Sequence, residues 1–129
     1  MFTPPDLMQA AAAKARHSAA QQAVHARNIA HADTPGYQAR RLPPFAEAYA
    51  QDHGALRATR PRHLHGTAPR QLPEARIDPA PATRKPNGNT VSLEQEMVLA
   101  TRTSGAHEWA LSIYSTARNI LRTSIGRGA

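Results

Sequence analysis

The stretch SLEQEMVLATRTSGAHEWALSIYSTARNILRTSI, residues 92–125, contains no proline and predicts one helix about 50 Å long at 1.5 Å per residue. The turn signal Asn87-Gly88 precedes it, and Ser92 and Gln95 match a capping box at its start. A repeat of three and four residues runs through Leu93, Met97, Ala100, Ser104, His107, Leu111, Tyr114, Arg118, Leu121 and Ile125. Such a helix exceeds what a 129-residue globule needs, so we expect it to pack along another helix.

Residues 6–33 form the other long proline-free segment, and they predict a helix that begins near Pro4-Pro5-Asp6 and runs to about Ala32. Alanines follow one another along it in steps of three or four residues. This stripe reflects either the high helix propensity of alanine or a face of small residues that lets another helix approach closely. Under the second interpretation, the packing face, within one chain or between neighbouring chains, comprises Ala12, Ala15, Ala19, Ala23, Ala26, Leu93, Met97, Leu111, Tyr114 and Leu121.

A strong stop signal ends the first helix. Thr34 precedes a proline and is therefore disfavoured in the helical region, and Pro35-Gly36 fits the central pair of a type II turn. The side chain of Asp33 or Asn28 is suited to satisfy free backbone groups at this helix end.

The middle of the chain, residues 38–86, is rich in proline and holds most of the arginines. It allows a short helix from Leu42 to Ala50, and we expect the rest to be extended or disordered, without a core of its own. The sequence thus divides into an N-terminal helix and turn (1–37), a basic middle segment (38–86) and a C-terminal helix (87–129). The predicted fold is mainly α, with the two terminal helices paired like a coiled coil and little or short β-structure between them.

Composition limits the function classes. The chain is only 5% aromatic, and its 40% apolar content is largely alanine, so we expect partner chains to assist its stability. Its net charge of +7 raises nucleic acid, anionic lipid or an acidic protein as partners. Cysteine is absent, which excludes disulfides and thiol catalysis. No stretch is apolar enough for a membrane span and no signal peptide is evident, so we expect a cytosolic chain or export without a cleaved signal.

Motifs for catalysis are missing from the sequence. It contains no phosphate-binding glycine loop, dinucleotide fingerprint, nucleophile elbow or zinc-protease motif, so we expect no enzyme activity and no cofactor. His63-x-His65, with His53 upstream, lacks a third ligand and an orienting carboxylate, so we expect no metal site. A basic helical protein that binds nucleic acid remains the alternative function, although no known nucleic-acid-binding motif supports it.

The segment Asn28-Ile29-Ala30-His31-Ala32-Asp33-Thr34-Pro35-Gly36-Tyr37 resembles the N-terminal signature of bacterial flagellar rod and hook proteins. That signature reads asparagine-isoleucine-alanine-asparagine, a short spacer, and threonine-proline-glycine-tyrosine; this sequence departs from it at His31. Three further stretches are similar to the proximal rod members of the family. They are Thr59-x-x-x-His63-Leu64, Asn87 to Met97, and Ile125-Gly126-Arg127.

The resemblance implies a structural subunit of the flagellar basal body, located in the rod that crosses the periplasm and required for motility. It assigns the assembly motif to Asn28, Ile29, Thr34, Pro35, Gly36 and Tyr37. Implied partners are copies of the chain itself, FlgC-like and distal rod proteins, a FliE-like adaptor at the membrane ring, and the flagellar type III export machinery. It implies neither a small-molecule substrate nor nucleic acid, and export through that machinery would need no cleaved signal peptide.

Overall fold

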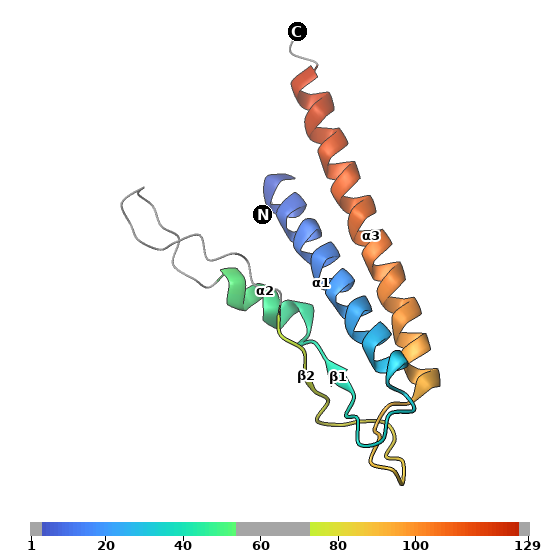
Figure 1. The fold of residues 1–129 in the computed structure, drawn as a ribbon. Helices are drawn as coiled ribbons and strands as arrows, with labels where there is room; N and C mark the ends of the chain where they lie inside the picture. Colours follow the sequence, from blue (N-terminus) through green and yellow to red (C-terminus); the bar gives the residue numbers. More distant parts are fainter. Residues whose placement is uncertain (1–3, 54–72, 127–129) are drawn as a thin grey trace.

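Two long antiparallel helices dominate the structure, a computed structural model that describes residues 4–53 and 73–126 (Figure 1). Helix α1 spans Pro4–Ala30 and helix α3 spans Leu93–Gly126. Between them lie strand β1 (Arg40–Arg41), helix α2 (Phe45–His53) and strand β2 (Arg76–Ile77). The described chain is therefore mainly α-helical with very short strands, as the sequence predicts.

The ends of both long helices agree closely with the predicted ones. Helix α3 begins one residue after Ser92, whose Oγ accepts a bond of 3.5 Å from the Gln95 amide, as expected of a helix N-cap. Helix α1 ends two residues before the predicted position, and the amide of His31 is shared between the carbonyls of Arg27 and Asn28. Local sequence signals were therefore sufficient to define both helices.

The described parts of the middle segment, residues 38–53 and 73–86, form an arm that lies beside α1 (Figure 1). Strands β1 and β2 pair antiparallel, with Arg40 opposite Ile77 and Arg41 opposite Arg76. Helix α2 begins at Phe45, later than the predicted Leu42, because Leu42 and Pro43 each precede a proline and are disfavoured in the helical region. The expectation for residues 54–72, which include His63, His65 and the Thr59 motif, falls outside the described residues.

The buried apolar core is small and consists mostly of alanine. Within residues 4–53 and 73–126, the buried apolar residues are Ala11, Ala15, Ala32, Ala39, Val91, Ala110 and Ala117. Large apolar residues remain exposed instead: Leu7, Ile77, Leu93, Met97, Val98, Trp109, Leu111, Ile120 and Ile125. Since stabilisation by burial scales with apolar area, this chain gains little from its own core.

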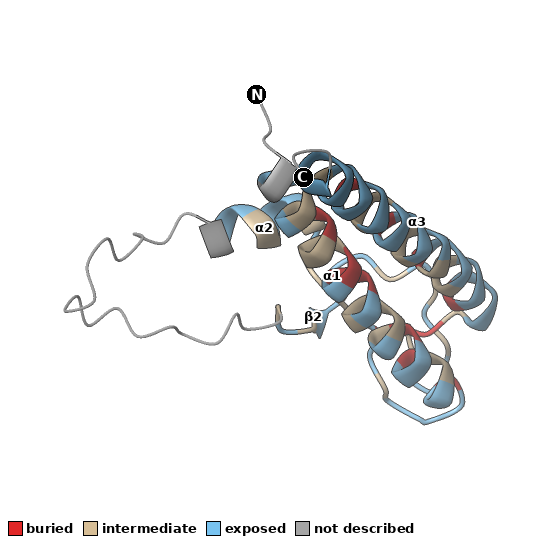
Figure 2. Cartoon of the chain, turned by 90° about the horizontal axis from the view of Figure 1, so that it is seen from above, coloured by how far each residue is buried: buried red, intermediate tan, exposed pale blue. Residues whose placement is uncertain are grey.

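Helix α3 is longer than its partner. It has 34 residues against 27 in α1, so its C-terminal end extends past the start of α1 (Figure 1). Most of its surface is exposed, with buried residues on the side facing α1 (Figure 2). No helix among the described residues combines the length and apolarity needed to span a bilayer.

Candidate assembly surface

Asn28 organises the exit from α1. Its side chain is fully buried, and its Nδ2 donates to the carbonyl of Arg40 at 2.9 Å. Its Oδ1 accepts from the amide of Arg40 at 3.1 Å and from the hydroxyl of Tyr37 at 3.2 Å. The amide thus pairs with the backbone of β1 as a neighbouring strand would, which fixes where the chain leaves the helix and enters the arm.

The turn after α1 has the predicted geometry. The Tyr37 amide donates to the Thr34 carbonyl at 3.3 Å, and Gly36 has a φ of 73°, as position i+2 of a type II turn requires. The Gly36 amide in turn donates to the carbonyl of Asn87 at 2.9 Å. A Cβ at Gly88 would lie 3.4 Å from the Cα of Gly36, so the two loops approach each other closely. We call this contact, together with Asn28 and Asn89, the junction.

Asn89, rather than Asp33 or Asn28, provides the side-chain amide that bonds the carbonyls just after the end of α1. Its Nδ2 donates to the His31 carbonyl at 2.9 Å and to the Thr34 carbonyl at 2.7 Å. Asp33 is exposed, and Asn28 is occupied by the arm. The sequence interpretation was wrong here because it considered only local side chains, whereas the cap comes from a residue far along the chain.

His31 lies on the surface of the junction, at the position where the flagellar signature has asparagine. Its ring stacks on Tyr37 with 4.6 Å between centroids and 17° between planes. Its Nδ1 lies 3.2 Å from the hydroxyl of Thr34. The imidazole therefore extends the aromatic surface of the turn while keeping a polar contact with it. Of the other motif residues, Pro35 is exposed and Ile29 is half-buried.

The contact between α1 and α3 follows a seven-residue spacing on both helices, which is the spacing of coiled-coil seams. The seam residues are Ala11, Ser18 and His25 on α1, and Glu96, Thr103, Ala110 and Ala117 on α3, all buried. A side-chain bond also crosses the pair, because His107 Nδ1 lies 2.9 Å from the carbonyl oxygen of Ala15. Small side chains allow this close approach.

The predicted packing face coincides only in part with this seam. Ala15 is buried and Ala12, Tyr114 and Leu121 are half-buried. The remaining predicted residues, Ala19, Ala23, Ala26, Leu93, Met97 and Leu111, are exposed. For contact within one chain, that part of the prediction was wrong. It followed the stripe of alanines and apolar residues, whereas the seam is displaced by about one residue and contains the polar side chains of Ser18 and His25.

The six exposed residues nevertheless lie on one side of the helix pair. Ala19 follows the seam residue Ser18, and Leu111 follows the seam residue Ala110. In an antiparallel pair of right-handed helices, a step of about 100° past the seam carries both residues to the same side. Asn28 contacts the arm on the opposite flank of α1. We call the surface formed by Ala19, Ala23, Ala26, Leu93, Met97 and Leu111 the open face.

The other flank of α3 carries a second exposed row. Val98, Trp109 and Ile120 are spaced by eleven residues, about three helical turns, so they align along the helix. Trp109 is 71% exposed, which is unusual for so large an apolar side chain. We call these three residues the outer row.

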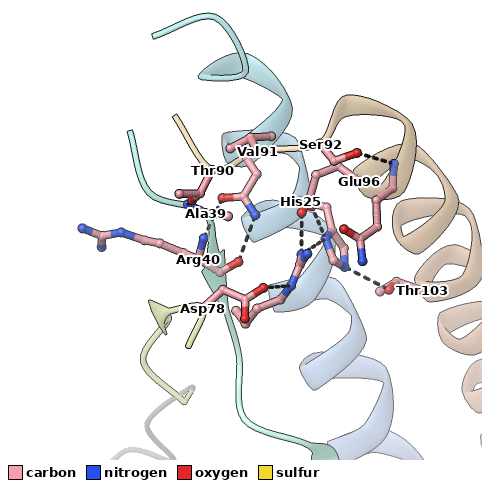
Figure 3. A network of polar contacts seen from close by, with 12 residues as sticks. His25, Ala39, Arg40, Asp78, Thr90, Val91, Ser92, Glu96 and Thr103 are labelled. Carbon is pink, nitrogen blue, oxygen red and sulfur yellow. Dashed lines mark hydrogen bonds and ion pairs between the residues drawn. The ribbon is translucent and has the colours of Figure 1, made fainter. Parts of the chain in front are cut away.

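A charge network missed by the sequence interpretation joins three seam residues to the arm (Figure 3). Glu96 Oε2 accepts from His25 Nδ1 at 2.8 Å, and Glu96 Oε1 accepts from Arg41 Nη1 at 2.6 Å. Arg41 Nε donates to Asp78 Oδ2 at 3.1 Å, and His25 Nε2 lies 3.3 Å from the Thr103 hydroxyl. Because the carboxylate can only accept, the Nδ1 of His25 carries the hydrogen. The signal that could have found Glu96 and His25 is their place in the seven-residue spacing.

His17 holds the start of α2 against α1. Its ring is 3% exposed, and its Nε2 donates to the Pro43 carbonyl at 2.9 Å. Phe45 lies edge-on to it at 5.6 Å, with Lys14 Nζ placed 5.0 Å from the Phe45 ring centroid. Burial lowers the pKa of His17 below its ordinary value of 6.5, the bond to Pro43 opposes this shift, and the Lys14 charge adds to it.

Among the described residues, no group of three or more histidine, cysteine, aspartate or glutamate side chains could hold a metal ion. The charge network has its polar atoms paired with one another, and its carboxylates lie on basic side chains. Its geometry is that of a structural ion-pair cluster joining separate elements. No protein-family model and no curated protein matches the chain.

Proposed function

We propose that this chain is a structural subunit of the bacterial flagellum, a FlgB-like component of the proximal rod of the basal body. One observation carries the proposal: the terminal helices pair through an alanine-rich seam while their large apolar residues remain exposed. Leu111, Met97 and Trp109 are each more than two-fifths exposed. A chain arranged in this way gains its main apolar burial from neighbouring subunits, as a subunit of an assembly does.

The junction supports the same proposal. Asn28, Thr34, Gly36 and Tyr37, which carry the resemblance to the flagellar signature, have defined structural roles at the point where helix pair and arm meet. A segment of this kind sets the direction of the arm relative to the helices. In an assembly built from helix pairs, every subunit would then present its arm in the same way.

The open face is the surface we assign to subunit contacts. Its alanines leave room for a close helix approach, and its leucines and methionine offer apolar area. The partners we propose are further copies of the chain, FlgC-like and distal rod proteins, and a FliE-like adaptor at the membrane ring. The chain would reach the rod through flagellar type III export, without a cleaved signal peptide.

The test is deletion of the gene for this chain, followed by assays of swimming and electron microscopy of basal bodies. The proposal predicts loss of swimming and absence of completed rods, both restored by the wild-type chain. A deletion strain that swims normally and builds complete rods would overturn it. Salt-sensitive retention of the purified chain on DNA would then favour the nucleic-acid-binding alternative.

A further inference from the structure

One charged side chain of the arm forms ion pairs both within the arm and with the helix pair. Arg41, in β1, reaches Asp78 just after β2 and Glu96 on α3 at the same time. Its Nε donates to Asp78 Oδ2 at 3.1 Å, and its Nη1 donates to Glu96 Oε1 at 2.6 Å. Arg41 is therefore the residue at which both strands of the arm and the C-terminal helix are joined.

Glu96 depends on this contact. Its side chain is 1% exposed, and a buried carboxylate without a counter-ion is strongly destabilising. The described charged groups facing it are Arg41 from the arm and His25 from α1, and His25 is positive only when protonated. The permanent positive charge beside Glu96 thus comes from the arm and not from either long helix.

The strands themselves hold the arm weakly. Each has two residues, and a two-stranded ladder is marginal at best without further packing. The amide of Asp78 donates to the Ala39 carbonyl at 2.8 Å, which extends the ladder by one bond. The attachment of β2 therefore relies on the Arg41–Asp78 pair as well as on backbone bonds.

We propose that Arg41 couples the pairing of α1 with α3 to the docking of the arm, so that the two helices pair stably only when the arm is docked. We call this role of Arg41 the latch. With the arm in place, the guanidinium neutralises Glu96 inside the seam, and the helices close over it. With the arm displaced, Glu96 loses its permanent counter-ion at the point where the helices meet. Helix pairing and arm docking then form one cooperative unit, whatever assembly the chain enters.

The adjacent Arg40 provides a matched control. Its side chain points away from the network (Figure 3), and its contacts with Asn28 use only backbone atoms. Arg41→Met and Arg40→Met remove the same charge from neighbouring positions of one strand. We expect Arg41→Met to speed hydrogen exchange about tenfold or more at the Asp78 amide and at seam amides of α1 and α3, the effect of losing a charge-assisted bond. Arg40→Met should leave these rates at the wild-type level.

A second variant covers the case in which Arg41→Met does not fold. Since the damage comes from a carboxylate left without its counter-ion, Arg41→Met combined with Glu96→Gln should exchange more slowly and unfold later than Arg41→Met alone. Wild-type protection of Asp78 and of the seam in Arg41→Met would overturn the latch. The latch would also be overturned if Arg41→Met lost protection at Asp78 while the seam amides kept theirs. A double variant that is no more stable than Arg41→Met would overturn it as well.

Discussion

At the scale of single residues, buried polar side chains carry much of the specificity of this fold. Asn28 bonds both backbone groups of Arg40 in β1, Asn89 bonds the His31 carbonyl just after α1, and Glu96 receives its counter-ion from a distant strand. Since alanine packing tolerates sliding of one helix along another, these directional bonds fix a single register. Two predictions follow from individual side chains.

The first concerns Asn28. Asn28→Ala removes bonds to both backbone groups of Arg40 and to the Tyr37 hydroxyl, leaving partly buried groups without partners. We expect the free energy of unfolding to fall by about 2–4 kcal/mol. Urea denaturation followed by circular dichroism measures it. Asn119→Ala, at an exposed position of α3, is the control and should stay within about 0.5 kcal/mol of wild type. Equal effects of the two changes would contradict the role of Asn28.

The second concerns His17 and pH. Because burial lowers the pKa of His17 in the folded chain, the unfolded chain binds more protons below pH 6.5. The contribution of neutral His17 is therefore fully present above pH 6.5 and is lost as the pH falls toward the folded pKa. We expect wild type to lose more stability than His17→Gln between about pH 7 and pH 5. Urea denaturation at both pH values gives the two losses, and an equal loss would exclude His17 as the source.

At the scale of elements, local sequence signals set the ends of the helices, but the helix faces that pack against each other were harder to predict. The capping serine, the Pro35-Gly36 turn and the absence of proline set the ends of α1 and α3. The seam could not be read from apolar residues alone, because it includes His25 and Glu96. His25 and Glu96 at seam positions have their partners on other elements, which the sequence order does not bring together.

Gly105 provides the prediction for α3. It lies in the interior of the helix, it is exposed, and an added Cβ would meet nothing within 4 Å. Glycine lowers helix stability by about 1 kcal/mol relative to alanine, so Gly105→Ala should raise the free energy of unfolding by about that amount. Thermal and urea denaturation of the isolated chain measure this change. A lower stability would show that the glycine meets a requirement within the chain.

At the scale of the whole molecule, the chain exposes on α3 the apolar residues that a globular protein would bury. The open face and the outer row lie on different flanks of α3, so more than one neighbour could contact a single subunit. If two different surfaces of one chain contact neighbours, the contacts are heterologous and build closed rings or open helical filaments, according to the rotation between neighbours. This arrangement agrees with the proposed place of the chain in a rod.

We expect a substitution on the open face to impair assembly without changing the folding of the single chain. Ala19 is exposed in the single chain, so Ala19→Leu should leave the helical content and melting temperature of the soluble monomer near wild type. In cells it should abolish swimming, because the larger side chain prevents close approach of a neighbouring helix. Ala46→Leu makes the same substitution at an exposed position of α2 and should preserve swimming. Normal motility with Ala19→Leu would exclude this part of the open face from assembly.

The mainly helical fold, the ends of the two long helices and the turn at Pro35-Gly36 follow from the amino-acid sequence alone. These features depend on proline placement, capping residues and glycine conformation, which act over a few neighbouring residues. Three features could be seen only in the folded chain: which helix faces meet, how Asn89 caps α1, and that Arg41 of the arm neutralises Glu96. Those contacts join residues more than fifty positions apart, and their energies depend on burial and distance, which local sequence does not specify.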